Sequence, residues 1–116
     1  MSELAKKLQL RPGQKISISG PAPELDLAAE RVDVTAADAA LIFVGDRAEL
    51  EQRLPVLAEV AGRDGTAWVA YPKARQLGTD LNRDIIAGLV PTAGLDTVRQ
   101  VSIDDTWSAL RLKAVR

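Results

Sequence analysis

Apolar runs separated by polar turns predict three strands of a sheet. The run "AALIFVGD", residues 39–46, is apolar until its polar end and too short for most helices, so it suits a central strand buried on both faces. The run "GTAWVAYP", residues 65–72, has the same character. In "QKISISG", residues 14–20, Ile alternates with Ser, which is typical of a strand with one apolar face.

The segment from Asp46 to Gly62 predicts an amphipathic helix. Asp46 and Glu49 have the spacing of a capping box, with Asp46 in the cap role. Apolar residues then recur at helical spacing, namely Leu50, Leu54, Leu57, Ala58 and Ala61. Pro55 removes a backbone hydrogen bond inside this helix, so we expect a bend there. Gly62 suits the C-terminal cap.

Shorter elements are predicted in the N-terminal part of the chain. Ser2 is placed to cap a helix over Glu3–Leu10. One or two helical turns are expected over Glu24–Glu30, followed by a short strand over Arg31–Val34.

A further helix is predicted over "DLNRDIIAGLV", residues 80–90, with Thr79 or Asp80 as its cap. Asp80 and Asp84 would share one face of it, a spacing that raises the question of a hard cation. Magnesium requires more oxygen ligands in near-octahedral order, so a solvated face is the better interpretation and no metal site is expected. Arg83 could pair with Asp80 on that face.

Two alternating segments end the chain and predict an antiparallel hairpin. They are "DTVRQVSI", residues 96–103, and "WSALRLKAV", residues 107–115, separated only by a polar turn that contains Asp104 and Asp105. "VRQVSI" is the expected exposed edge, where Arg99 discourages uncontrolled pairing but still suits a symmetric dimer. The order of elements predicts an α/β fold: a single three-layer Rossmann-like domain over residues 1–116, with a mainly parallel sheet and this C-terminal hairpin.

Composition narrows the chemistry. The 116 residues fit one domain, and 15 Lys and Arg against 16 Asp and Glu give a net charge of −1, without the basic excess of a nucleic-acid binder. The sequence has no Cys and no His, which excludes disulfides, the usual zinc sites and nucleophiles activated by histidine. No signal-peptide pattern and no membrane span are recognisable, so we expect a cytoplasmic protein.

The order of motifs resembles the second half of a class I methyltransferase domain. "ADAALIFV" is similar to that fold's buried strand after an aspartate, and "RDGTAWVAYPK" to its turn and following strand. "AGLDTVRQVSI" and "WSALRLKAV" look like its closing hairpin. The resemblance implies that the last strand inserts antiparallel between its neighbours.

A resemblance over nearly the whole chain points to a family of small bacterial proteins, a domain of unknown function. It rests on "LAKKLQLRPGQKISI", "DRAELEQRLPVL", "WVAYPK", "TDL" and "DDTWSALRL". This family supplies an expectation of fold and no activity.

The sequence departs from a working methyltransferase where the cofactor would bind. The segment "SISGPAPEL" has Gly20 alone in place of closely spaced glycines, and only Asp33 could stand in for the acidic residue that holds the ribose. The cofactor pocket therefore looks truncated. No cofactor is expected, and S-adenosylmethionine belongs only to the alternative in which the chain is an enzyme.

In a doubly wound sheet, ligands gather where the parallel strands end. Here that rim includes "VAYPKARQLGTDLNRD", residues 69–84, in which cations precede a helix start suited to an anion. The candidate ligand-binding residues are Ser19, Gly20, Gly45, Asp46, Lys73, Arg75 and Thr79. Ordinary loop and cap chemistry is the competing interpretation, because a carboxylate at Asp80 would satisfy the same amides and oppose an anion.

Two further candidates lie in the hairpin. Trp107 is either a core anchor against Trp68 or a partner-facing residue, since tryptophan is enriched in both settings. Ser108 has no histidine to activate it and would need Lys73 nearby. No catalytic residue is assigned.

Arg111 and Lys113 alternate with apolar residues and would share one face of the last strand. If that strand is central, both cations must reach past a covering helix or find carboxylates.

The sequence thus favours a small α/β domain that is non-catalytic and acts through contacts with a protein or a small anionic ligand. One alternative is a binder of a nucleotide-like or phosphorylated small molecule at the rim. The other is a methyltransferase-like enzyme.

Overall fold

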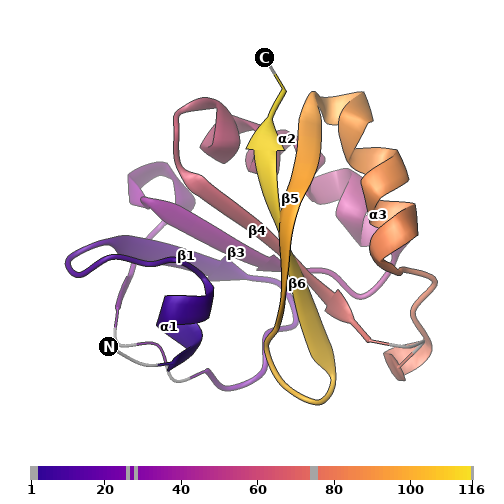
Figure 1. Ribbon diagram of the computed structural model, residues 1–116, viewed down its shortest axis with the longest axis horizontal. Helices are drawn as coiled ribbons and strands as arrows, with labels where there is room; N and C mark the ends of the chain where they lie inside the picture. Colours follow the sequence, from indigo (N-terminus) through magenta and orange to yellow (C-terminus); the bar gives the residue numbers. More distant parts are fainter. Residues whose placement is uncertain (1–2, 26, 28, 74–75, 116) are drawn as a thin grey trace.

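A mixed six-stranded sheet organises the computed structural model, which describes residues 3–25, 27, 29–73 and 76–115 (Figure 1). The strands are β1 Lys15–Ser19, β2 Glu30–Arg31, β3 Ala39–Phe43, β4 Thr66–Pro72, β5 Leu95–Ser102 and β6 Trp107–Ala114. The helices are α1 Glu3–Lys7, α2 Arg47–Gly62 and α3 Arg83–Leu89, with 3₁₀ turns at Val34–Ala36, Gln76–Gly78 and Val90–Ala93. No helix in the described part of the chain is long and apolar enough to cross a membrane.

The strand order is β2-β1-β3-β4-β6-β5. Strands β2, β1, β3 and β4 are mutually parallel, whereas β6 runs antiparallel to both of its neighbours, β4 and β5. The expected insertion of the last strand is therefore confirmed, and β5 is an edge of the sheet as predicted. A hairpin turn leaves β6 no alternative to the antiparallel direction next to β5.

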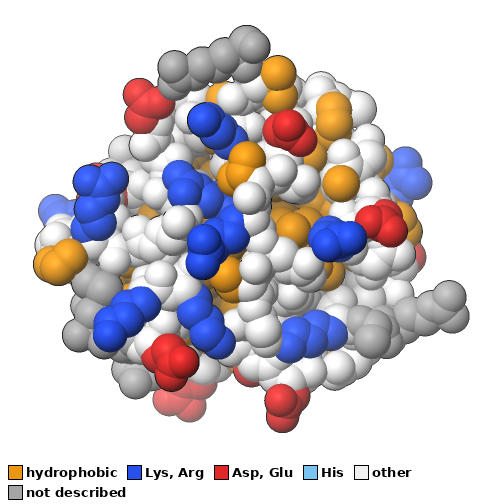
Figure 2. Space-filling view, viewed as in Figure 1, with side chains coloured by type: hydrophobic (Ala, Val, Ile, Leu, Met, Phe, Trp, Pro, Cys, Tyr) orange, Lys and Arg blue, Asp and Glu red, His pale blue; other side chains and the backbone are white. Residues whose placement is uncertain are grey.

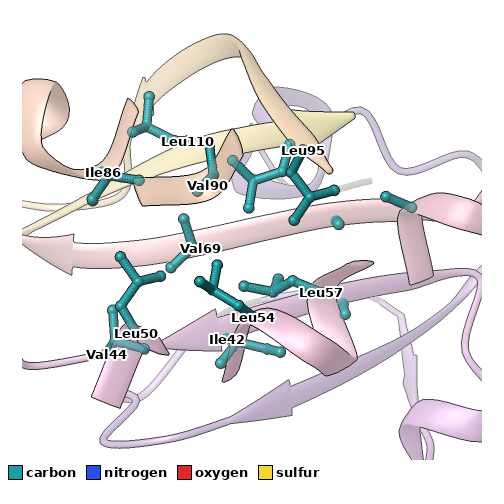
Figure 3. Packing of buried hydrophobic residues seen from close by; sticks show 14 of the residues in the cluster. Ile42, Val44, Leu50, Leu54, Leu57, Val69, Ile86, Val90, Leu95 and Leu110 are labelled. Carbon is teal, nitrogen blue, oxygen red and sulfur yellow. The ribbon is translucent and has the colours of Figure 1, made fainter. Parts of the chain in front are cut away.

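Helices α2 and α3 pack on one face of the sheet. Their buried side chains meet the apolar side chains of β3, β4 and β6 (Figure 3). Residues of this cluster labelled in the figure are Ile42, Val44, Leu50, Leu54, Leu57, Val69, Ile86, Val90, Leu95 and Leu110. Every residue of β3 is buried, which confirms the expectation of a central strand covered on both faces.

The opposite face is covered differently. Among the described residues its helical cover is α1 alone, which lies in front of the sheet in Figure 1. The buried indole of Trp68 donates from Nε1 to the carbonyl oxygen of Leu8 at 3.0 Å. This bond fixes the end of α1 against β4, because an unpaired indole N–H in the core would be costly.

The start of α2 follows the predicted chemistry. The Asp46 side chain accepts a hydrogen bond from the Glu49 amide at 2.9 Å. Glu49 reaches back to the amide of Gly45 rather than to that of Asp46. The helix then continues through Pro55. Gly62 is its last helical residue, and the left-handed position beyond the end is Asp64, with φ of 63°.

Other predictions need correction. The described residues between Glu24 and Ala29 contain no helix, and the strand expected over Arg31–Val34 is instead β2, ending at Arg31. Helix α1 ends at Lys7, earlier than expected, and Ser2 lies outside the described residues.

The cap of α3 is also corrected. It is Asn82, whose side chain accepts from the Ile85 amide at 2.8 Å, and neither Thr79 nor Asp80 caps this helix. Asp80 therefore precedes the helix and does not share a helical face with Asp84. Arg83 contacts Asp84, at 3.8 Å, in place of Asp80.

Candidate functional site

The predicted strand rim comprises the ends of β1, β3 and β4 and the loops that follow them. At the end of β1, Gly20 has φ of +87°, and a Cβ there would lie 1.9 Å from the carbonyl oxygen of Phe43. The backbone of Gly20 thus packs directly against the end of β3. This glycine is required by the close approach of two strands, so its presence does not indicate a ligand.

Carboxylates of the chain itself occupy the start of α2. Asp46 accepts from the Glu49 amide, and Glu49 accepts from the Gly45 amide. The side chain of Asp80 accepts from the Arg47 amide at 2.8 Å. Asp80 therefore does oppose an external anion, but at α2 rather than at α3. With three carboxylates at this helix end, an anion from solution would meet both filled donors and like charge.

Lys73 follows β4 directly, but its backbone and side chain contact the C-terminal hairpin. Its amide donates to the carbonyl oxygen of Thr106 at 2.7 Å, and its Nζ donates to Oγ of Ser102 at 2.5 Å, both in or beside the turn of the hairpin. Thr79 is buried, and its Oγ accepts from the Leu81 amide at 3.1 Å. Arg75 lies outside the described residues.

The half-buried Ser19 lines a separate hollow of about 320 Å³ between β1 and α2, together with Ser17, Asp33 and Arg53. The carboxyl group of Asp33 accepts hydrogen bonds from the hydroxyl group and the amide of Thr35. Both bonds lower its pKa, and the hydroxyl group has the larger effect. The lining of this hollow includes neither Gly45 nor Asp46, and Lys73 contacts the hairpin turn instead.

The hydroxyl groups near Lys73 do not form an activated nucleophile. Ser108 is buried and donates to the carbonyl oxygen of Val101 at 3.1 Å, while Lys73 reaches Ser102 instead. Ser102 accepts from the Lys73 ammonium group and its Oγ donates to the carbonyl oxygen of Asp104 at 3.3 Å. The serine proton is therefore directed at a carbonyl group and not at a base.

Trp107 lies in the core and is only 5% exposed. Its ring meets Phe43 edge to face, with ring centroids 4.9 Å apart, rather than packing as a pair with Trp68. Very little of the indole is accessible to a partner. Its amide is held by the side chain of Asp104 at 2.7 Å, consistent with the predicted turn chemistry of that aspartate.

A second concave region lies between the hairpin, Gln9 and the turn that joins α2 to β4. We call it the hairpin hollow; its volume is about 370 Å³, and its charged lining residues are Arg99, Arg111, Lys113 and Asp64. Arg99 and Arg111 are direct partners across β5 and β6. Lys113 is two positions further along β6, so the three cations share the face that carries α1.

The cations of the hairpin hollow outnumber the acidic side chain in its lining, Asp64, by three to one. No salt bridge joins Arg99, Arg111 or Lys113 to a described carboxylate. Arg111 donates from Nη1 to Oε1 of Gln9, a neutral acceptor. Asp96 lies opposite Lys113 in the ladder, but its carboxylate accepts from the Thr97 amide at 3.0 Å. Like charges directly opposite each other destabilise a strand pair, so a negative charge placed between Arg99 and Arg111 would relieve their repulsion.

Figure 2 shows the same face in space-filling form. A column of Lys and Arg side chains runs down its middle, beside the hairpin seen in Figure 1. No group of three or more carboxylates within the described ranges is arranged to hold a metal ion.

Comparisons with known proteins identify a structural likeness only. No family model matches the sequence, and no curated protein matches it. Among solved structures, LepI in complex with SAM is similar, with a TM-score of 0.48 and 14% sequence identity. The match covers 96% of this chain but 39% of that chain, so this chain spans about two-fifths of the LepI chain. The strand order remains the basis for the fold, a mixed α/β sheet compatible with a Rossmann-like arrangement.

Sequence reasoning anticipated the cations of β6 but not the hairpin hollow. It placed Arg111 and Lys113 on one face and expected them to reach past a covering helix or to find carboxylates. The structure supplies Gln9 for Arg111 and leaves Lys113 exposed. The available signal was the presence of two cations on one face of an otherwise apolar strand.

Proposed function

We propose that this chain is a non-catalytic binding domain that recognises an anionic group in the hairpin hollow. In this proposal the domain is a trimmed, three-layer methyltransferase-like fold in which the strand rim no longer serves as the ligand site. The observation that carries the proposal is the grouping of Arg99, Arg111 and Lys113 around one hollow without a described salt-bridge partner.

The chemistry of arginine supports a carboxylate or phosphate group as the ligand. Guanidinium groups present several donors in a planar fork and bind such oxygens in pairs. The Arg111 side chain is half-buried and held by Gln9, which reduces the conformational entropy lost on binding. A volume of about 370 Å³ is within the range of small-ligand sites.

Thermal unfolding with and without anions tests this proposal. Citrate, phosphate and sulfate should each be added at constant ionic strength against chloride, because general salt effects also change stability. A ligand at ten times its Kd stabilises the native state by about 1.4 kcal/mol, which raises Tm by roughly 6 °C for a domain of this size. SAM in the same assay tests the methyltransferase alternative.

The variant Arg99→Gln should have opposite effects on the stability of the ligand-free protein and on its response to anions. Removing one of two facing cations should leave the ligand-free protein as stable as before or slightly more stable, yet abolish most of the anion response. Arg83→Gln on α3 is the matched control and should keep the full response. Equal anion responses in Arg99→Gln, Arg83→Gln and the unmodified chain would refute recognition in the hairpin hollow.

A further inference from the structure

We infer that the anionic group is carried by an extended acidic segment of a partner protein, which adds to the sheet alongside β5. This inference rests on the proposed function and specifies its partner. It follows from three features of the hairpin: an open strand edge, the direction of its amides, and the placement of cations and apolar side chains beside that edge.

The outer edge of β5 is open in the described structure. Strand β5 is the last strand of the sheet, next to β6 alone. The backbone hydrogen bonds within the described chain include none from another strand to the outer side of β5. An edge of this kind is a ready template for an extended peptide.

The direction of individual amides follows from the ladder. The Ile103 amide donates to the carbonyl oxygen of Trp107 at 3.0 Å and so faces β6. Because successive amides of a strand point to opposite sides, those of Ser102 and Gln100 face outward. Lys7 reaches the carbonyl oxygen of Ser102 at 3.3 Å, which agrees with an outward-facing Ser102. Two outward donors are thus available at the hairpin end of β5, whereas an added strand would have to displace Lys7 to reach the outward carbonyl oxygen of Ser102.

Side chains next to this edge favour an acidic segment with some apolar positions. Arg99 is exposed on β5 beside the hairpin hollow, and Lys7 stands near the turn. Val98 is 51% exposed, and Val101 is half-buried on the α1 face. A strand that presents an acidic residue opposite Arg99 and an apolar residue opposite Val101 would complement both.

The edge is selective as well as open. The ladder is irregular between Thr97 and Arg99, so Val98 forms a bulge. Bulges and charged side chains are the devices that prevent uncontrolled pairing at sheet edges. A basic or neutral strand would leave the Arg99–Arg111 pair uncompensated, whereas an acidic strand relieves it. Charge therefore selects the partner, and the backbone supplies its register.

Fluorescence anisotropy with labelled ten-residue peptides tests this inference. The probe peptide alternates Glu with Val, a second peptide replaces each Glu with Gln, and a third keeps Glu but carries N-methyl groups on alternate residues, which blocks its pairing edge. The Glu peptide should bind, the Gln peptide about tenfold more weakly, and the N-methylated peptide not measurably. Binding should also slow amide hydrogen exchange at Gln100 and Ser102.

A charge swap separates recognition from a structural effect. Arg99→Glu should lower the affinity for the Glu peptide by about tenfold, and this variant should bind a peptide that alternates Lys with Val. Arg83→Glu on α3 is the control and should change neither affinity. Rescue by the Lys peptide is an outcome that mere misfolding of Arg99→Glu would not produce.

The outcomes also separate this inference from the proposed function. Equal binding of the N-methylated and unmodified Glu peptides would overturn strand addition. A thermal response to citrate or phosphate with no peptide binding would overturn the inference and leave anion recognition standing. No response to any anion and no peptide binding would overturn both.

Discussion

Replacing Gly20 with Ala, beside the same change at Gly13, measures how closely the end of β1 packs against β3. Both glycines have left-handed backbone, with φ of +87° at Gly20 and +83° at Gly13. A Cβ at Gly13 would meet nothing within 4 Å, whereas one at Gly20 would lie 1.9 Å from the carbonyl oxygen of Phe43. The two variants therefore share the backbone strain and differ in the contact.

The expected magnitudes follow from that difference. A non-glycine residue in the left-handed region costs about 1–2 kcal/mol, and the reduced entropy of the unfolded chain returns about 0.4–1 kcal/mol. Gly13→Ala should therefore lower the free energy of unfolding by about 1 kcal/mol. At Gly20 the strands must also separate by more than about 1 Å to restore van der Waals contact, which adds roughly 2–3 kcal/mol.

Urea unfolding followed by circular dichroism, together with calorimetry, provides the measurement. At about 4 °C per kcal/mol for a domain of this size, Gly13→Ala should melt about 4 °C lower and Gly20→Ala at least 12 °C lower. Failure of Gly20→Ala to accumulate as folded protein would agree with this contact. Free energies of unfolding within about 1 kcal/mol of each other would refute the packing role of Gly20 and reopen the strand rim as a ligand site.

Two further predictions concern carboxylates. Asp80→Ala removes the acceptor of the Arg47 amide and should lower the free energy of unfolding by about 1 kcal/mol in urea titrations. The control Asp84→Ala, at an exposed position, should change it by less than about 0.5 kcal/mol. Similar losses in the two variants would contradict the hydrogen bond from α2 to Asp80. Thr35→Val should raise the pKa of Asp33 in carboxyl NMR titrations, since the hydroxyl group lowers it. The pKa of Asp33 is lower in the native state than in the unfolded state, so its hydrogen bonds stabilise the fold when the carboxyl group is ionised. Thr35→Val should therefore show its largest loss of stability above the unfolded-state pKa, and the loss should shrink as pH falls through the native pKa. A loss of stability that does not change with pH would contradict this coupling.

The buried strands could be predicted because their signal is local. A strand covered on both faces must be apolar along its length; β3 has this property throughout, and β4 has it from Ala67 onward. The start of α2 was predictable for the same reason, since Asp46 and Glu49 satisfy amides within a few residues of themselves.

The start of α3 could not be predicted because several neighbouring residues have the same chemistry. Thr79, Asp80 and Asn82 are all good caps. The choice depends on a distant partner: Asp80 is taken by the amide of Arg47, 33 residues away in sequence. Local propensity cannot distinguish residues whose roles are assigned by tertiary contacts.

The hairpin hollow depends on one irregularity that the sequence does not reveal. Thr97 pairs with Leu112, so a regular ladder would place Val98 opposite Arg111 and turn Arg99 to the other face. The bulge shifts the register by one residue and brings Arg99 opposite Arg111 instead. The grouping of the three cations is thus a product of strand geometry, and alternation alone would have separated Arg99 from the other two.

The sparse cover of the α1 face explains why an internal strand tolerates cations. Strand β6 lies between two neighbours, a position where Arg111 and Lys113 would be desolvated if helices covered both faces. Here the helical cover of that face, among the described residues, is α1, and its C-terminal neighbour Gln9 reaches only Arg111. Lys113 stays hydrated, and the guanidinium group of Arg111 gains an acceptor without losing its charge. The same openness that removes the desolvation cost leaves Lys113 exposed and Arg111 half-buried, which is why we propose recognition on the hairpin rather than on the strand rim.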